Sequence, residues 1–274
     1  LIKDKLENPA NPSLKLTLLS ALTIGTSCFF QPRNLLFAVT IIGIYALSIS
    51  GRKAQAKFAA ISLAAMMIFP IVLVSRNMEA IGSATISTNL GTTMFIGVGD
   101  GATGGYNGKY NGVPCPAAEK GTEAEIDSAK VKCALLWNIQ NPGKAITLAA
   151  KKSIFFWSPW FGPEANGTMA RNPWLTVSPL RDIALSSEDG YKLVYGTAGK
   201  IASWVWLVGG LGLLLYGFLI LWRLASIEKL LAALALITVG SNWVISLMTI
   251  GDHRFRIPVM GLSLFLQAIG LKTL

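Results

Sequence analysis

The chain has 274 residues, of which 52% are hydrophobic and 14% are charged, whereas roughly 25% of residues are charged in an average soluble domain. This composition argues against a single soluble domain. Lys and Arg exceed Asp and Glu by 24 to 14; such a basic chain could bind nucleic acid, but its apolar character makes the lipid bilayer the expected partner and no nucleic acid is expected.

Six apolar runs predict transmembrane helices, three before residue 75 and three after residue 200. They are Leu14–Phe30, Asn34–Ser50, Phe58–Val74, Ile201–Leu221, Leu230–Ile250 and Ile257–Leu271. About 20 helical residues cross ~30 Å of hydrocarbon, so the first three runs and the last need polar flanks to complete the crossing. The sequence therefore predicts an all-α membrane protein with three transmembrane helices in 1–75, a large mixed loop region in 76–200, and three more helices in 201–274.

The basic residues predict the orientation of these helices. If six spans alternate, most of the Lys and Arg residues in the termini and short loops lie on one face of the membrane, namely Lys3, Lys5, Lys15, Arg52, Lys53, Lys57, Arg223, Lys229 and Lys272. Only Arg33, Arg254 and Arg256 lie in the short loops of the other face. The positive-inside rule makes the first face cytoplasmic and the long loop extracytoplasmic. Because the chain starts with Leu1 and its last apolar run stops at Leu274, we expect it to be a piece of a longer membrane protein.

Two cysteines fall in the long loop, where the predicted compartment is oxidising. Cys115 and Cys133 either form a disulfide, which would contribute about 3 kcal/mol, or remain free thiols. The sequence alone does not show whether their Cα atoms approach within the required ~7 Å. No CxxC spacing is present, so no structural metal site is predicted.

The first part of the long loop is rich in Gly, Thr and Asn, in a run from Asn89 through Asp100 to Tyr106. Gly97-x-Gly99-x-x-Ala102 imitates a dinucleotide fingerprint, but that motif needs a preceding strand in a βαβ unit. The run is either an ordinary loop with many turns or a wall of a substrate site built from backbone. Asp100 either caps its own turn, which we favour, or contacts sugar hydroxyls or a divalent cation.

Residues 134–162 predict a membrane-proximal helical segment. Its first part is Ala134–Gln140, a break follows at Asn141-Pro142-Gly143, and Lys144–Trp157 resumes the helix. Two lysines precede an aromatic cluster formed by Phe155, Phe156, Trp157, Trp160 and Phe161, which suits the headgroup level of a bilayer. The alternative is a helix packed on a soluble subdomain.

The second short outer turn carries a cluster of charge. Arg254 and Arg256 flank Phe255 at the start of the last apolar run, and Pro258 suits the first turn of a helix. A guanidinium presents donors that match phosphate oxygens, so a lipid-linked phosphate at the bilayer surface is a natural ligand. The alternatives are ordinary phospholipid headgroups or an ion pair with Asp252. His253, the only histidine, receives no role.

Several segments, taken in order, resemble the C-terminal half of the bacterial GT-C glycosyltransferases that use polyprenyl-phosphate sugars, a superfamily that includes protein O-mannosyltransferases and aminoarabinose transferases. The similar segments cover nearly the whole chain: Thr23 to Asn34 with Gln31-Pro32-Arg33-Asn34, Ser75-Arg76-Asn77, Ser87 to Tyr106, Trp137 to Pro142 leading to Lys152, and His253 to Pro258. This chain departs from the family where it has Gly97-Val98 instead of Gly-Asn and Pro32-Arg33 instead of Arg-Pro.

The resemblance implies a multi-pass protein of the bacterial plasma membrane. The enzymes of this superfamily carry out an inverting transfer. An acceptor hydroxyl, deprotonated by a carboxylate, attacks the anomeric carbon of the sugar, and the lipid phosphate leaves. Cations on the phosphate would stabilise the departing charge, and the expected lipid-phosphate-binding residues are Arg254, Arg256, Arg33, Arg76 and Lys152. The resemblance also implies that the catalytic carboxylate lies upstream of Leu1, so the catalytic residue is unknown in this chain. The acceptor is also unknown. Some members of the superfamily depend on a divalent cation and others do not, and the sequence does not decide between these two possibilities.

Two other functions compete with this one. A non-catalytic membrane module could bind a lipid-linked glycan or scaffold a partner enzyme, since the acidic residue is missing. A transporter is less favoured, because the predicted spans hold almost no ionisable residues of the kind that ion pathways use.

Overall fold

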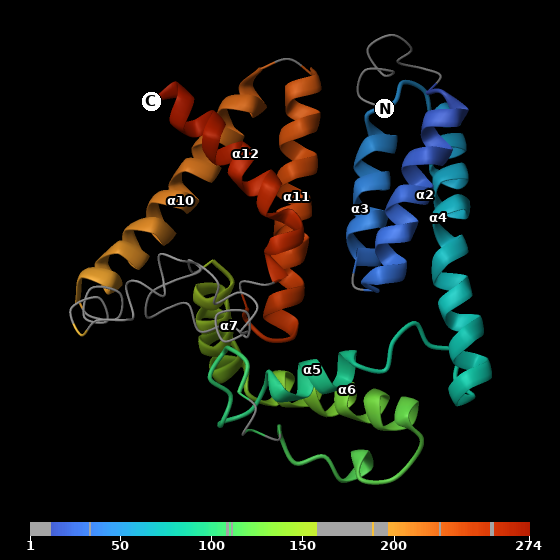
Figure 1. Cartoon of the computed structure of the whole chain (residues 1–274), viewed down its shortest axis with the longest axis vertical. Coiled ribbons are helices and arrows are strands. Elements are labelled where there is room, and N and C mark those ends of the chain that lie inside the picture. The colour runs from blue at the N-terminus through green and yellow to red at the C-terminus, as the bar shows by residue number, and fades with distance from the viewer. Residues whose placement is uncertain are drawn as a thin grey trace. The chain divides into compact units, whose positions relative to one another are not determined.

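The computed structural model describes residues 12–32, 34–107, 110, 112–157, 188, 197–224, 226–252 and 255–274. Every regular element in these ranges is a helix (Figure 1). Three of the described helices are long and apolar enough to span a membrane: α4 (Arg52–Ile81), α10 (Thr197–Arg223) and α11 (Ser226–Met248). The expectation of an α-helical membrane protein is confirmed to this extent. The other apolar helices, α2 (Leu14–Phe30), α3 (Asn34–Leu47) and α12 (Ile257–Thr273), have 14 to 17 residues.

The chain divides into two compact units. The first contains Leu1–Thr88 and Phe218–Ser241, and the second contains Asn89–Gly217 and Asn242–Leu274. The division between them passes through α10 and α11, whereas the sequence predicted divisions near residues 75 and 200.

The first unit is built on three helices that pack side by side, α2, α3 and α4 (Figure 1). Their core includes Tyr45, Phe58 and Met66, and Leu230 of α11 belongs to the same cluster. A Cβ at Gly25 of α2 would lie 2.8 Å from Met66 O, so only glycine permits this approach to α4. The threonine hydroxyls of α2 and α3 donate to carbonyls one turn earlier, which satisfies them in apolar surroundings: Thr17, Thr23, Thr26 and Thr40.

Helix α4 differs from its sequence prediction at both ends. The sequence predicted a span over Phe58–Val74, but the helix begins at Arg52 and ends at Ile81, and Gly82 follows it with φ +66°. Its 30 residues cover ~45 Å. The flanks are rich in Ala, Lys, Gln and Met, which favour helix but not hydrocarbon, so hydropathy alone marked only the apolar middle. Arg76 and Asn77 therefore lie within a helix and not after it.

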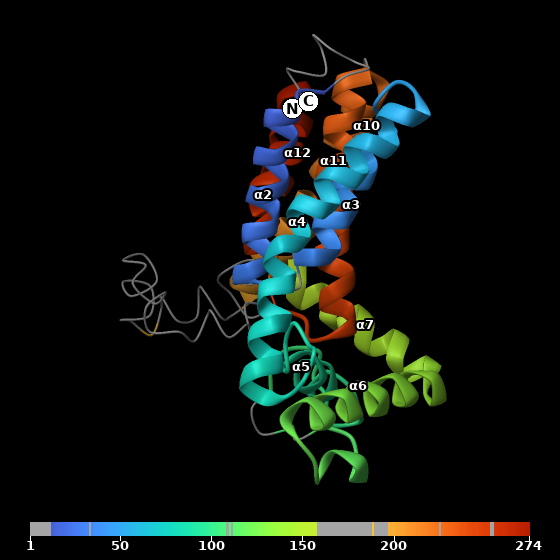
Figure 2. The same ribbon diagram turned by 90° about the vertical axis from the view of Figure 1, so that its right-hand side faces the viewer.

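In the second unit, α5 (Leu90–Ile96) packs along α6 (Glu123–Gln140), as both views display (Figures 1 and 2). Their core contains Met94, Phe95, Val98 and Ala134. A short 3₁₀ helix, η1 (Pro116–Ala118), follows Cys115, and a disulfide joins Cys115 to Cys133 of α6 with the Cα atoms 6.0 Å apart. The loop thus closes onto α6.

Helix α7 (Pro142–Trp157) follows α6 after a single non-helical residue, Asn141. The predicted break at Asn141-Pro142-Gly143 is confirmed, because Pro142 begins a new helix and cannot continue the old one. Helix α6 starts eleven residues before the predicted Ala134. A capping box fixes this start: Thr122 accepts from the backbone of Glu125, and the Glu125 carboxylate accepts from the backbone of Thr122.

Glycines also bring α10 and α12 together within the second unit. A Cβ on Gly217 would collide with Leu266 O, and one on Gly270 would collide with Leu213 O. Gln267 Nε2 donates to Gly210 O at 3.0 Å across the same contact. Small residues with a polar cross-link are typical of helix packing in membranes.

Candidate functional site

The C-terminal half of α7 packs against the segment that joins α11 to α12. Phe156 is fully buried and forms a cluster with Ile250 and Phe255, with Trp157 and Trp243 at its edge. Trp243 Nε1 donates to Ser153 Oγ at 3.1 Å, which ties α11 to α7. This junction buries two of the cations that the sequence predicted as phosphate ligands.

Lys152 is the first of these cations. Its side chain is 3% exposed, and its ammonium donates to Leu247 O at 2.8 Å. No carboxylate in the described part of the chain forms an ion pair with it. Burial therefore lowers the pKa of Lys152 from 10.5 to about 8. A lysine has three donors, and this hydrogen bond uses one of them.

Arg256 is the second. Its side chain is 8% exposed, its Nη1 donates to Trp157 O at 2.7 Å, and its Cζ lies 5.9 Å from the centre of the Trp157 ring. Burial lowers the pKa of Arg256 from 12.5 to about 10, so the guanidinium stays charged at neutral pH. Asp252, which lies in the same turn, is fully buried.

Both cations contact the last turn of a helix. Leu247 precedes Met248, the final residue of α11, and Trp157 is the final residue of α7. Carbonyls in a last turn have no partner within the helix and carry the negative end of the helix dipole, so they attract cations. For Lys152, whose partner is such a carbonyl, a ligand could add a full negative charge.

Glycines let the loop after α5 reach this junction. A Cβ on Gly97 would collide with Thr249 O, and one on Gly251 would lie 2.5 Å from Lys152 Cα. Gly251 N donates to Gly104 O at 2.7 Å, which closes the loop onto the segment between α11 and α12. The backbone of the loop after α5 therefore packs against the segments that carry the buried cations. The resemblance of Gly97-x-Gly99-x-x-Ala102 to a dinucleotide fingerprint is misleading, because the helix α5 precedes it instead of a strand.

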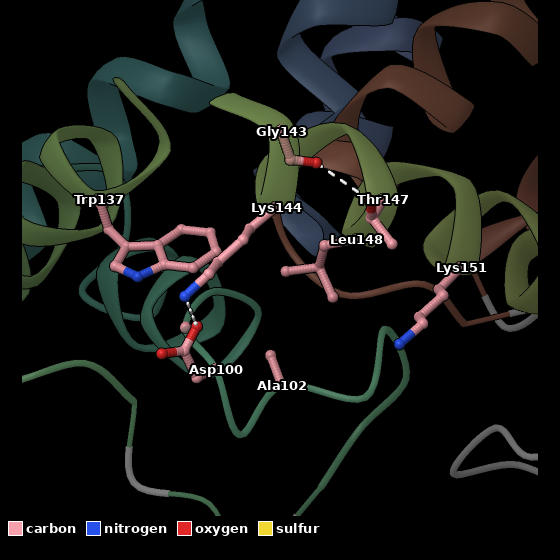
Figure 3. A pocket seen from close by; sticks show the side chains of 9 residues that line it. Asp100, Ala102, Trp137, Gly143, Lys144, Thr147, Leu148 and Lys151 are labelled. Atoms are coloured by element: carbon pink, nitrogen blue, oxygen red, sulfur yellow. Dashed lines mark hydrogen bonds and ion pairs between the residues drawn. The ribbon is translucent and has the colours of Figure 1, made fainter. Parts of the chain in front are cut away.

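A pocket of about 260 Å³ lies on the other side of this loop (Figure 3). One face of α7 forms its first wall, the loop at Gly99–Ala102 forms the second, and Trp137 of α6 forms the third. Lys144 Nζ donates to Asp100 Oδ1 at 2.8 Å across the pocket. The sequence favoured Asp100 as a cap of its own turn, whereas its carboxylate accepts a hydrogen bond from Lys144 of α7, 44 residues away.

The other predicted site residues have different surroundings. Arg76 is exposed in α4 of the first unit, Asn89 is exposed at the N-cap of α5, and Tyr106 is 42% exposed. Arg33 and Arg254, like His253, lie outside the described residues. Among the predicted phosphate ligands, Lys152 and Arg256 are the two that the structure places, buried, in the segments that meet at this junction.

Sequence reasoning named Asp100 of the pocket but missed the residues of α7 that line it. The spacing of four of these residues is i, i+3, i+4 and i+7, and they are Lys144, Thr147, Leu148 and Lys151. This spacing could have identified one face of α7. In the described ranges, no group of three or more His, Cys, Asp or Glu side chains is placed to bind a metal. No family model, curated protein or solved structure matches the chain.

Proposed function

We propose that the chain forms part of a membrane glycosyltransferase that transfers a sugar from a polyprenyl-phosphate carrier to an acceptor hydroxyl, and that Lys152 and Arg256 bind the carrier phosphate. The observation that carries this proposal is the burial of two cations at one junction, each contacting a backbone carbonyl. Burying an ammonium without a carboxylate is costly, and cores rarely retain such a group without a function. A phosphate would supply the missing negative charge.

The chemistry fits what two cations can do. When an acceptor hydroxyl attacks the anomeric carbon, the bond from that carbon to the phosphate oxygen breaks and negative charge grows on the phosphate. Donors already fixed in place stabilise this charge in the transition state without reorganising, an effect of several kcal/mol in a site that excludes water. The carboxylate that takes the hydroxyl proton is not assigned to a residue of this chain.

A membrane location places this phosphate at a suitable depth. We propose that the six apolar helices span the membrane with polar flanks, and that α7 lies at the extracytoplasmic surface. Ile139 and Ile146, at the two sides of the bend between α6 and α7, are 74% and 71% exposed. Lys144 and Lys151 lie on the same helix as Ile146, two and five residues from it along the chain. Exposed aliphatic residues with neighbouring lysines are typical of segments that rest on the headgroup region.

Binding of the lipid phosphate tests the proposal directly. The full-length protein in nanodiscs is titrated with a short-chain polyprenyl phosphate, and the intrinsic fluorescence of its tryptophans reports binding because Trp157 contacts Arg256. Loss of one charge-assisted hydrogen bond costs about 1.5–3 kcal/mol, so Lys152→Met and Arg256→Gln should each weaken binding at least ~10-fold. The matched control, Lys132→Met on an exposed position of α6, should bind as the wild type does.

Three further measurements sharpen this test. The corresponding polyprenol, which lacks the phosphate, should bind the wild type weakly and with no dependence on Lys152. Arg256→Lys, which keeps the charge, should retain part of the affinity if the folded site is intact. Radiolabelled polyprenyl-phosphate sugars in vesicles then report transfer. Equal affinity of wild type and Lys152→Met for the phosphate would refute the assignment of the site.

One observation favours a non-catalytic module as the second candidate. Asp100 is the carboxylate that lines the pocket, and its Oδ1 atom accepts a hydrogen bond from Lys144. That oxygen already accepts from the ammonium, so it is poorly placed to take a proton from an acceptor hydroxyl. Lipid-phosphate binding by the full-length protein without transfer of any sugar would support this candidate.

A further inference from the structure

The pocket between α7, α6 and the loop after α5 is distinct from the junction that buries Lys152. Lys151 lines the pocket, whereas the neighbouring Lys152 is buried in the junction. Successive helical residues point about 100° apart, so one turn of α7 serves both places. The loop crosses the helix at this level, since a Cβ on Gly104 would lie 2.8 Å from Lys151 Cβ and 3.2 Å from Lys152 N.

The size of the pocket restricts its ligand. Its volume of about 260 Å³ lies below the ~300–1,000 Å³ of ordinary ligand pockets, so it suits a single small ring. Trp137 and Leu148 provide apolar surface, and Trp137 presents a flat indole beside the ion pair (Figure 3). An aromatic face next to a few polar groups is a common way to bind a compact molecule that has one apolar face and several hydroxyls.

The charges in the pocket specify the ligand further. Lys144 and Asp100 contact each other, but their side chains are 61% and 74% exposed, so both can also bind a ligand. The hydrogen bond from Lys144 uses Oδ1 of the carboxylate, and Oδ2 can accept from a hydroxyl of a ligand. Lys151 is exposed and forms no ion pair within the described ranges. Two ammonium groups against one carboxylate give the pocket a net charge of one positive unit.

We propose that this pocket binds a monosaccharide unit that carries one anionic group, either a carboxylate or a phosphate. The sugar ring lies on Trp137, its hydroxyls bind Asp100 and Lys144, and its anionic group binds Lys151. In the proposed glycosyltransferase this sugar belongs to the acceptor. That last assignment rests on the proposed function, whereas the binding itself does not.

Saturation-transfer NMR on the full-length protein in nanodiscs tests the proposal with four small probes. Glucuronate and glucose 6-phosphate should bind with millimolar or tighter dissociation constants, and glucose should bind at least ~10-fold more weakly. Inorganic phosphate should compete only weakly, because it has no ring to lie on Trp137. Equal binding of glucuronate and glucose would overturn the proposal, as would displacement of glucuronate by equimolar phosphate, which would identify a simple anion site.

Lys151→Met provides the decisive variant, because an exposed side chain can be changed without disturbing the fold. It should weaken glucuronate and glucose 6-phosphate at least fivefold and leave the weak binding of glucose unchanged. The exposed control Lys132→Met should bind all probes as the wild type does. Unchanged affinity of Lys151→Met for both anionic sugars would refute the proposal. Polyprenyl-phosphate binding is measured on the same wild-type preparation, so failure of the proposed function is seen separately from failure of the sugar site.

Discussion

Replacing Lys152 with Met should remove a pH dependence of stability that burial imposes on the wild type. The pKa of Lys152 falls from 10.5 to about 8 on folding, which corresponds to roughly 3 kcal/mol of destabilisation of the charged form. Below about pH 8 the folded and unfolded chains both hold the proton, and the folded chain bears this full cost. Between about pH 8 and 10.5 only the unfolded chain holds it, so stability rises with pH.

Thermal unfolding in detergent at pH 7 and pH 10 measures this effect. The wild type should gain most of the ~3 kcal/mol from Lys152 over this range, which in a domain of 150–250 residues corresponds to a shift of several degrees. The Lys152→Met variant should lack this gain. Its stability at pH 7 should change less, because Met removes the buried charge but leaves Leu247 O without its donor, a loss of about 1–3 kcal/mol.

The neighbouring exposed lysine supplies the control. Lys151→Met makes the same chemical change one residue away and should keep the pH response of the wild type, since Lys151 is exposed. Bound polyprenyl phosphate should stabilise the wild type at pH 7 and reduce its gain at pH 10, because a phosphate favours the charged ammonium. Parallel pH responses of wild type and Lys152→Met would refute the reasoning that burial of this ammonium destabilises the fold.

Two further predictions concern the backbone around the site. Replacing both Cys115 and Cys133 with Ser should destabilise the packing of α5 on α6 by about 3 kcal/mol. Limited proteolysis of this region should then become faster. An unchanged rate of proteolysis would contradict a stabilising disulfide. Gly251→Ala should cost about 1–3 kcal/mol and weaken polyprenyl-phosphate binding, because its Cβ would press on the backbone of Lys152. Gly143→Ala, whose Cβ meets open space, is the control; equal unfolding temperatures for the two variants would count against this close contact.

The helices were the most predictable part of the fold. Leu14–Phe30 coincides with α2 because its apolar run ends at Gln31-Pro32, where a helix is poorly continued. The start of α6 was also predictable, since Thr122-x-x-Glu125 is a capping-box sequence. The prediction from hydropathy instead placed the start of this helix at its apolar end. Where a helix extends beyond an apolar run, its end must be predicted from capping residues, because hydropathy does not mark it.

The burial of the two cations could not be read from the sequence. Lys152 contacts a carbonyl 95 residues away and Arg256 contacts one 99 residues away, so their surroundings depend on how α7 packs on the end of α11. In the sequence, Lys151 and Lys152 are the same residue type in adjacent positions. Only the tertiary packing makes one of them a pocket residue and the other a buried charge.

The way these cations are held bears on whether they are structural. A purely structural role at a buried position is served as well or better by an apolar residue of similar volume, since desolvation of a charge often exceeds what its partners return. Lys152 departs from that expectation, because its ammonium donates to a neutral carbonyl and its charged form is disfavoured by burial. Close packing of Gly251 fixes the backbone of Lys152, and the hydrogen bond to Leu247 O holds its ammonium, so both are placed before any ligand arrives. A cation that is held in place by packing and destabilised by its surroundings gains most from a bound anion, which is the property that a site for a departing phosphate requires.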